Sequence, residues 1–329
     1  MQSLFIDRKG TTLDVSGGRL IIRPPDTPRP MSLPVKQVRY LVLSASVDLS
    51  STVLLSLNSA GITLVIINPR QPDGAMICGG HRHGNIARRI RQYGLLQDSG
   101  QRLALARQLL QAKLRTQYRA LARQRNRRPD LRHPLTVALR QIRERWQAIS
   151  ESGSLASLRG LEGAAAAAYF AAITKLVAPA WGFTSRRRRP PPDPVNAVLS
   201  LTYTLVHGEA VRALMGHGLD PGLGCLHDID YNRESLACDL VELLRADCDR
   251  WVLELFRGQT LRQCHFQQPD ANHSMLNKDG RAIFYPEYQR AAKQWQKRCR
   301  NLARQWAALL GDIDEVNEDE DDEPPLPYD

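Results

Sequence analysis

The chain has 329 residues, of which 43% are hydrophobic and 24% charged, and its formal net charge is +11. This length and composition exclude a disordered chain or a small disulfide-stapled domain and suit a globular protein with two sizeable cores. No basic-then-apolar leader opens the chain, its six cysteines form no Cys-x-x-Cys pair, and its longest nearly uncharged apolar run, residues 163–174, is too short to cross a bilayer. We therefore expect a reduced, cytoplasmic protein without membrane insertion.

The positive charge lies away from the carboxyl terminus. Residues 311–329 hold ten acidic side chains and no Lys or Arg, which leaves 45 cations against 24 acids, a net charge of +21, on the rest of the chain. A body this basic is expected to bind a polyanion, most often nucleic acid. The acidic segment has no apolar periodicity, so we expect a disordered tail that screens the basic surface or binds a partner.

The first ninety residues predict a small β-rich domain. Three short strands, at residues 3–7, 11–15 and 19–23, are separated by Lys9-Gly10 and by Ser16-Gly17-Gly18, which are hairpin signals. These three strands are therefore predicted to form a meander. Further along we expect a strand at residues 38–43, a short helix at 50–60 and a buried strand at 62–67.

From Asp98 onward the apolar residues recur at helical spacing. We expect a long arginine-rich helix, a basic turn at residues 123–132 and a second helix over about 134–149. The change of pattern places a domain boundary near residues 84–97. The predicted fold class is α+β, with a β-rich amino-terminal domain (1–90), a larger all-α carboxyl-terminal domain (91–310) and the acidic tail (311–329).

The next predicted helix carries five consecutive alanines, residues 164–168, and should be thin enough for other helices to approach closely. Glu162 stands near its start among apolar neighbours, and a partly buried carboxylate needs a partner. Arg159 or a metal ion could supply that partner, and the residues alone leave both open.

Four adjacent arginines precede three prolines, and guanidinium groups match phosphate oxygens in geometry and charge. These candidates for DNA binding are Arg186, Arg187, Arg188 and Arg189. Asp193 followed by Pro194 predicts the start of a helix that carries Asn196 and Tyr203. For Tyr203 core packing is the default, and a position beside the substrate is the alternative.

The stretch from residue 218 to residue 242 organises the chain. His227 lies on a loop rich in Gly and Pro, just before a helix whose expected N-cap is Ser235. Asp239 and Glu242 lie three residues apart on that helix and share a face. Carboxylates with one imidazole suit Mg²⁺ or Mn²⁺, although a solvated acidic face and a polar loop histidine are the more frequent origin of such a pattern.

Five motifs occur in order along the chain. They are Arg-Gly-Leu-Glu-Gly at 159–163, Pro-Pro-Asp-Pro-Val-Asn at 191–196, Gly-Leu-Asp-Pro at 218–221, Leu-His at 226–227 and Ser-Leu-Ala-Cys-Asp-Leu-Val-Glu at 235–242. Their order and spacing resemble those of the CRISPR-associated integrase of spacer acquisition, over about residues 1–300. The chain departs from this resemblance at Asn232-Arg233-Glu234, where a Gly-Arg-Pro-like turn is common in that family.

The resemblance implies a role for each matched residue. Three match metal ligands for Mg²⁺ or Mn²⁺, namely Glu162, His227 and Glu242. Asp239 matches an acidic residue beside them, and Asn196 and Tyr203 match positions that line the family's active site.

The resemblance also implies the reaction and the partners. A metal-dependent integrase and endonuclease of this kind inserts new spacer DNA into a CRISPR array, when a DNA 3′-hydroxyl attacks a repeat phosphodiester and a new 3′-hydroxyl leaves. Prespacer and repeat DNA would be the nucleic-acid partners. The family architecture further implies a homodimer, with dimerisation through the β-rich domain, that joins a small adaptation protein. A reverse transcriptase is left open as a further partner.

Two interpretations from other classes remain. In one, the chain is a non-catalytic basic DNA-binding scaffold whose acids, Glu162, Asp239 and Glu242, make only salt bridges. A scaffold has no need of His227, which argues against it. In the other, the chain is a structural zinc module built from Cys225, His227, Cys238 and Cys248, but their spacing fits no usual zinc pattern.

Overall fold

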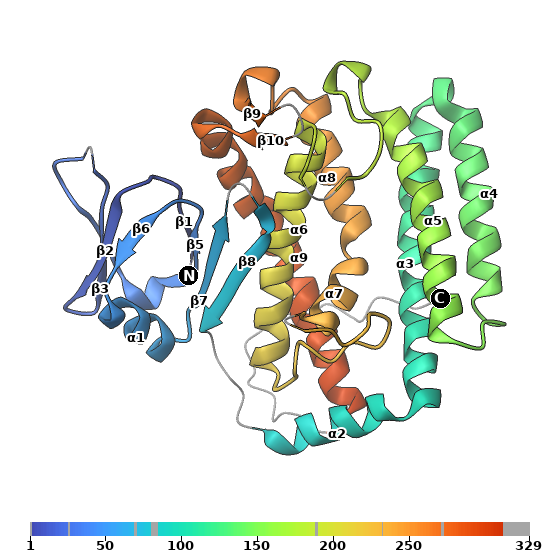
Figure 1. The fold of residues 1–329 in the computed structure, drawn as a ribbon, viewed down its shortest axis with the longest axis horizontal. Coiled ribbons are helices and arrows are strands. Elements are labelled where there is room, and N and C mark those ends of the chain that lie inside the picture. Colours follow the sequence, from blue (N-terminus) through green and yellow to red (C-terminus); the bar gives the residue numbers. More distant parts are fainter. Residues whose placement is uncertain are drawn as a thin grey trace.

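A computed structural model gives the fold of the protein, a β-rich part followed by a larger helical part (Figure 1). The structure describes residues 2–25, 27–68, 71–79, 85–187, 190–231, 233–270 and 273–311. Arg188, Arg189, Asn232 and the predicted tail from residue 312 lie outside the described residues. The predicted α+β class is confirmed.

Two four-stranded sheets make up the β-rich part, with strand orders β1-β5-β7-β8 and β4-β3-β2-β6. Their elements are β1 (Gln2–Ile6), β2 (Thr11–Ser16), β3 (Arg19–Arg23), β4 (Met31–Pro34), β5 (Val38–Leu43), β6 (Val47–Leu49), α1 (Ser51–Ser59), β7 (Thr63–Asn68) and β8 (Gln71–Gly79). A core of buried aliphatic side chains lies between the two sheets. The predicted strands near residues 38–43 and 62–67 and the short helix between them are confirmed.

The predicted meander of the first three strands is wrong. β2 and β3 form the expected antiparallel hairpin around Gly17 and Gly18, but β1 pairs in parallel with β5 in the other sheet. Gly10, with φ of +78°, therefore moves the chain from one sheet to the next. Packing explains the difference, because Ile6 of β1 and Leu13 of β2 then both enter the core between the sheets.

Helices form most of the rest of the chain. They are α2 (Ile86–Gln97), α3 (Ser99–Arg127), α4 (Arg132–Ala148), α5 (Leu155–Leu176), α6 (Pro194–Gly216), α7 (Ser235–Glu242), α8 (Arg245–Arg257) and α9 (Lys278–Leu309). Asp193 caps α6 as predicted, since its carboxylate accepts the backbone N–H of Asn196 at 2.9 Å. Ser235 is not the N-cap of α7, because it lies inside the helix and its hydroxyl donates to the carbonyl of Asp228 at 2.6 Å.

The helical part is not all-α. A two-stranded antiparallel hairpin, β9 (Phe266–Asp270) and β10 (His273–Leu276), lies between α8 and α9. Phe266 packs its ring against Phe256 of α8, with centroids 6.0 Å apart, which ties the hairpin to the helices. None of the described helices is long and apolar enough to cross a membrane.

Direct contacts join the two parts of the molecule. Phe5 of β1 stacks on Tyr285 of α9 with ring centroids 4.5 Å apart, and the Gln289 side chain donates to the carbonyl of Ser3 at 2.6 Å. β5 also approaches α6 closely at Gly208. A Cβ atom at this position would lie 2.2 Å from the Tyr40 hydroxyl, so only glycine leaves room for the approach. α6 is therefore buried between the sheet and the remaining helices, and it positions the elements that carry the site (Figure 1).

Candidate active site

Side chains from α3, α5 and α7 meet where these helices approach one another, with α7 between α6 and the long helices (Figure 1). Lys113 of α3 bridges the two carboxylates predicted as metal ligands. Its ammonium donates a hydrogen bond to Glu162 and lies 2.6 Å from Oε2 of Glu242. The side chains of Lys113 and Glu242 are each 3% exposed, whereas that of Glu162 is 29% exposed. Glu162 therefore forms the rim of the site and Glu242 its floor.

A second cation contacts the other oxygen of Glu242. The Nε atom of Arg245 lies 2.9 Å from Oε1, so each oxygen of this buried carboxylate faces a positive charge. Burial alone would raise the pKa of Glu242, but Arg245 and then Lys113 lower it to about 2. Glu242 is therefore ionised at neutral pH despite its burial.

Asp239 orients the histidine of the site. One of its oxygens accepts the backbone N–H groups of Cys225 and Leu226, at 2.7 and 3.1 Å, and the other lies 2.6 Å from Nδ1 of His227. A carboxylate at Nδ1 keeps the proton on that nitrogen and leaves Nε2 with the lone pair that a metal binds. The structure thus places Asp239 behind His227, with its own oxygens already occupied.

The donors suit a divalent ion, but their present arrangement is that of an ion-paired cluster. Across the described part of the chain, no three His, Cys, Asp or Glu side chains are arranged to hold a metal. This holds for the predicted ligands Glu162, His227 and Glu242. It also holds for the alternative zinc set of Cys225, His227, Cys238 and Cys248. Carboxylate oxygens and one neutral imidazole nitrogen remain a chemically suitable donor set for Mg²⁺ or Mn²⁺. The ammonium of Lys113 contacts the oxygens of Glu162 and Glu242 that such an ion would need.

Tyr203 lies in the wall beside this cluster. Two guanidinium groups lie over its ring, that of Arg245 at 4.6 Å and that of Arg186 at 5.4 Å from the centroid. Its hydroxyl donates to Asp249, a carboxylate that Tyr169 also contacts. Burial raises the pKa of Asp249 to about 6, against the opposing hydrogen bonds from both tyrosines. The Tyr203 hydroxyl is therefore committed to Asp249 in this structure.

Asn196 anchors the arginine loop. Its side-chain oxygen accepts from the backbone N–H of Arg187 and from the guanidinium of Arg186, both at 2.9 Å, and its amide donates to the carbonyl of Ser185. Arg186 also donates to Ser200 at 3.0 Å, so it points into the protein, whereas Arg187 is exposed. Of the two arginines of this group that the structure describes, Arg186 is therefore held by contacts within the protein and Arg187 lies at the surface.

Sequence reasoning missed three residues of this site. Lys113 falls on the apolar stripe of α3, four residues after Leu109, and a lysine in such a stripe was an available signal. Arg245 follows Glu242 by three residues, the spacing of neighbours on a helix, but Asp249 gave no local signal. Arg159 was suggested as the partner of Glu162, but it donates to the carbonyl of Leu226 at 2.9 Å and pairs with Asp228. Through these two contacts it supports the loop that carries His227.

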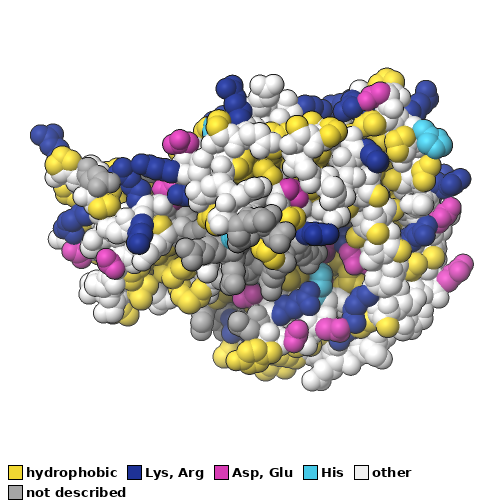
Figure 2. All heavy atoms as spheres, turned by 45° about the horizontal axis from the view of Figure 1, so that its top comes forward, with side chains coloured by type: hydrophobic (Ala, Val, Ile, Leu, Met, Phe, Trp, Pro, Cys, Tyr) yellow, Lys and Arg dark blue, Asp and Glu magenta, His cyan; other side chains and the backbone are white. Residues whose placement is uncertain are grey.

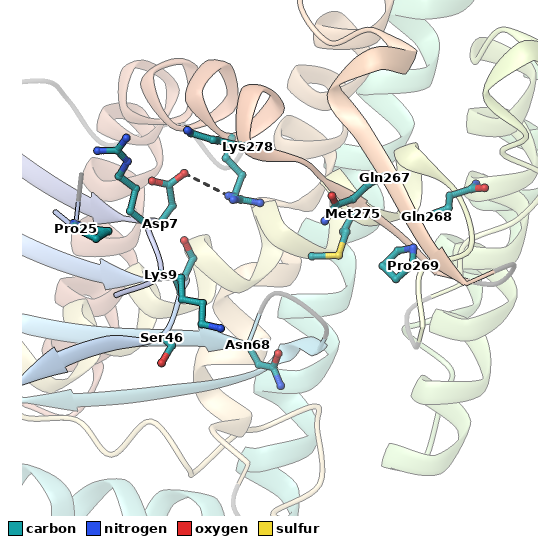
Figure 3. A pocket seen from close by; sticks show the side chains of 14 residues that line it. Asp7, Lys9, Pro25, Ser46, Asn68, Gln267, Gln268, Pro269, Met275 and Lys278 are labelled. Carbon is teal, nitrogen blue, oxygen red and sulfur yellow. Dashed lines mark hydrogen bonds and ion pairs between the residues drawn. The ribbon is translucent and has the colours of Figure 1, made fainter. Parts of the chain in front are cut away.

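A cavity of about 960 Å³ lies elsewhere, at the seam between the β-rich part and the β9–β10 hairpin (Figure 3). Lys9 and Ser46 line it from the β-rich part, Met275 and Lys278 from the hairpin and α9, and an ion pair of 3.3 Å between Asp7 and Arg281 crosses it. None of its lining residues belongs to the acid and histidine cluster. On the face drawn in Figure 2, Lys and Arg side chains are spread over both parts of the molecule, with Asp and Glu interspersed.

The fold, a two-sheet β-rich part joined to a helical body, is one that CRISPR-associated proteins share. The family model described as CRISPR associated protein Cas1 matches residues 4–290. The chain is 35% identical over 306 residues to CRISPR-associated endonuclease Cas1 1 of Thermodesulfovibrio yellowstonii, which covers 92% of this chain and 94% of the relative. The chain belongs to the Cas1 family.

Solved structures share the fold at low sequence identity. A CAS1 protein from Thermotoga maritima has a TM-score of 0.82 at 21% identity and covers 98% of this chain and 100% of its own. A casposase bound to integration product has a TM-score of 0.78 at 20% identity, covering 100% of this chain and 97% of its own. A chain of a Cas6-RT-Cas1–Cas2 complex has a TM-score of 0.80 at 20% identity, covering 94% of this chain and 35% of its own.

Proposed function

We propose that this Cas1-family chain is a divalent-metal-dependent DNA integrase and endonuclease that inserts new spacer DNA into a CRISPR array. The observation that carries the proposal is the meeting of Glu162 and Glu242 at one buried lysine, in a chain of the Cas1 family. The fixed imidazole of His227 supports it, since a purely electrostatic surface has no use for an oriented Nε2.

The proposed ligands of Mg²⁺ or Mn²⁺ are Glu162, His227 and Glu242. A bound ion would stabilise the charge that develops on a repeat phosphodiester as a DNA 3′-hydroxyl attacks it. Asp239 would keep the imidazole in place, and Arg245 would add a fixed positive charge beside Glu242. No protein nucleophile is needed, because one phosphodiester is exchanged for another. Water in place of the hydroxyl would give endonuclease activity.

We extend the proposal to the partners. The net charge of +21 on residues 1–310 supports binding of prespacer and repeat DNA. Exposed apolar residues support a homodimer, namely Leu54 and Leu55 on α1 and Ile86 and Ile90 on α2. The structural likeness to a chain of the Cas6-RT-Cas1–Cas2 complex supports a small adaptation partner and a reverse transcriptase as further candidates.

A non-catalytic DNA-binding scaffold is the second candidate, and one observation favours it. Both carboxylates, Glu162 and Glu242, make ion pairs, as a scaffold would require. A strand-transfer assay separates the two functions. It would join a DNA fragment with free 3′-hydroxyls to a plasmid that carries a CRISPR repeat, in the presence of Mn²⁺ or Mg²⁺.

We expect Glu162→Gln, His227→Ala and Glu242→Gln each to lower the joining rate by about a hundredfold or more, with DNA affinity largely retained. Glu144→Gln, which changes an exposed carboxylate of α4, is the matched control and should join strands normally. Joining by His227→Ala at the wild-type rate would refute the metal assignment. A wild-type protein that binds DNA but joins no strands with either ion would identify the scaffold.

A further inference from the structure

Lys113 is a buried cation at the position where the proposed metal ion would bind. It projects from the middle of α3 onto two carboxylates that come from different helices, Glu162 of α5 and Glu242 of α7. Burial of a charge is costly unless it is paired, and these two acids are the groups that pair it. Without the Lys113 ammonium, the two carboxylates would lie close together and Arg245 would be the cation left beside them in this cluster.

We propose that Lys113 is the resident cation of the metal-free site and that Mn²⁺ or Mg²⁺ binds by exchange with its ammonium. The proposal rests on the proposed function in one respect, since it takes Glu162 and Glu242 as metal ligands. It adds a residue that holds the two carboxylates together and competes with the ion for the same oxygens.

The surroundings make Lys113 the group that can leave. Arg245 is fixed by the ring of Tyr203 as well as by Glu242, whereas the Lys113 ammonium contacts the two carboxylates, Glu162 and Glu242. Glu162 is the partly exposed member of the trio, so the way out for the ammonium runs past Glu162. The lysine stem has four rotatable bonds, and rotation about them requires no movement of α3.

Charge counting gives the exchange a consequence for DNA. In the present arrangement the carboxylates of Glu162, Glu242 and Asp239 carry three formal negative charges, and Lys113 and Arg245 carry two positive charges, so these groups sum to −1. If a divalent ion were bound and Lys113 moved to the rim, the same groups with the ion would sum to +1. A phosphodiester carries one negative charge, so the exchange would turn a pocket that repels the substrate into one that attracts it.

The test measures Mn²⁺ binding and stability without any DNA. Lys113→Met removes the charge and keeps most of the length of the side chain. Lys293→Met, which changes an exposed lysine of α9, is the matched control. In isothermal titration calorimetry, Lys113→Met should bind Mn²⁺ about tenfold or more tightly than wild type, because the ion no longer displaces a like charge a few ångströms away. In a chelator, the same variant should melt at a lower temperature than wild type, and Lys293→Met should match wild type in both measurements.

A second measurement uses the wild-type protein and does not depend on how the variant folds. Lysine acetylation followed by mass spectrometry should find Lys113 protected in the metal-free protein and several-fold more reactive with saturating Mn²⁺. Lys293 should react equally in both states. Equal reactivity of Lys113 with and without Mn²⁺ would overturn the exchange.

The outcomes separate this inference from the proposed function. If wild type and Lys113→Met bind Mn²⁺ with equal affinity, or the variant binds it more weakly, the exchange is refuted and the metal site stands. If neither protein binds Mn²⁺, while Glu162→Gln also leaves DNA joining unchanged, the metal-dependent function fails together with the inference.

Discussion

Asp239 holds His227 by two contacts at once, because the same carboxylate oxygen that lies 2.6 Å from Nδ1 also accepts the backbone N–H of His227 at 3.2 Å. The other oxygen accepts two further backbone N–H groups, those of Cys225 and Leu226. One buried carboxylate therefore fixes both the loop that carries the imidazole and the rotation of the imidazole itself.

We predict that Asp239→Asn weakens both the fold and the metal site. The amide offers one oxygen where the carboxylate offers two, so at least one buried N–H donor is left without an acceptor, at a cost of about 1–3 kcal/mol in the free energy of unfolding. Mn²⁺ affinity should fall by about ten- to a hundredfold, as is usual when the group behind a ligating histidine is lost. Urea unfolding and Mn²⁺ calorimetry measure the two effects.

The control for this change is Asp14→Asn, since the Asp14 carboxylate is half exposed and far along the chain on β2. Its unfolding free energy and Mn²⁺ affinity should match wild type. Normal Mn²⁺ affinity in Asp239→Asn would mean that the imidazole does not need this carboxylate.

The arginine loop should divide into a structural residue and a DNA-binding residue. Changing all four arginines to Ser would mix the two effects, so single variants are more informative. Arg187→Ser should weaken binding to DNA of any sequence and lower the logarithmic salt slope by about one for each lost phosphate contact, with no change in stability. Arg186→Ser should instead lower the unfolding free energy by about 1–3 kcal/mol, because its contacts to Asn196 and Ser200 are lost. An unchanged salt slope in Arg187→Ser would show that this side chain does not face DNA.

Asp249 should make the fold less stable as the pH rises from about 4 to about 6. Burial raises its pKa in the folded protein to about 6, from 3.8 in the unfolded chain. The folded state therefore keeps its proton over a range in which the unfolded state has lost it. Below pH 4 the protonated Asp249 carboxyl makes its full contribution to the free energy of unfolding. By pH 7 this free energy has fallen by about 3 kcal/mol. The Glu242 carboxyl, with its pKa lowered from 4.5 to about 2, acts in the opposite direction, and its effect falls below pH 4.5 and overlaps only the lowest part of this range.

The amide in Asp249→Asn cannot ionise, so the free energy of unfolding of this variant should not fall as the pH rises. Urea unfolding at pH 4, 5, 6 and 7 should show the variant gaining stability relative to wild type as the pH rises, with most of the change between pH 4 and 6. Tyr203→Phe is a useful companion, since it removes a hydrogen bond that lowers the pKa of Asp249 and should move the transition to higher pH. A difference between wild type and Asp249→Asn that is constant across this range would refute the assignment.

Deleting residues 312–329 should raise the net charge from +11 to +21 without removing a buried residue that the structure describes. We expect an almost unchanged melting temperature and tighter non-specific DNA binding at low salt, with the difference fading at high salt as the Debye length shrinks. If this segment instead binds the adaptation partner, deletion would impair assembly at any salt and leave the DNA affinity of the isolated protein alone. A large drop in melting temperature would contradict both expectations.

Local signals in the sequence were enough for many elements. Short, nearly continuous apolar runs located β5 and β7, and the Asp193-Pro194 pair located the start of α6, because both depend on neighbouring residues alone. The parallel pairing of β1 with β5 was missed, since it joins segments more than thirty residues apart and leaves no local trace. The short strands β4 and β6 were missed for a related reason: four and three residues are too few for an alternating pattern to be recognised.

The candidate site was predictable to a similar degree. The motifs pointed to Glu162, His227 and Glu242, and the structure brings the two glutamates together on one lysine. Lys113 could not be singled out by charge, because α3 carries many other cations. Its place on the apolar stripe of α3 shows that it is buried, but the two carboxylates that it pairs with come from α5 and α7, which are distant in the sequence.

The stacking of Phe5 on Tyr285 and the hydrogen bond from Gln289 to Ser3 fasten the first strand of the chain to its last described helix. The covalent connection between β8 and α2 is therefore not what holds the β-rich part against the helical part. It contributes only a high effective concentration, while the interface sets the orientation. A protein expressed as two polypeptides, divided between Gly79 and Asn85, should consequently reassemble into the same particle, with the first segment packed against α6 and α9.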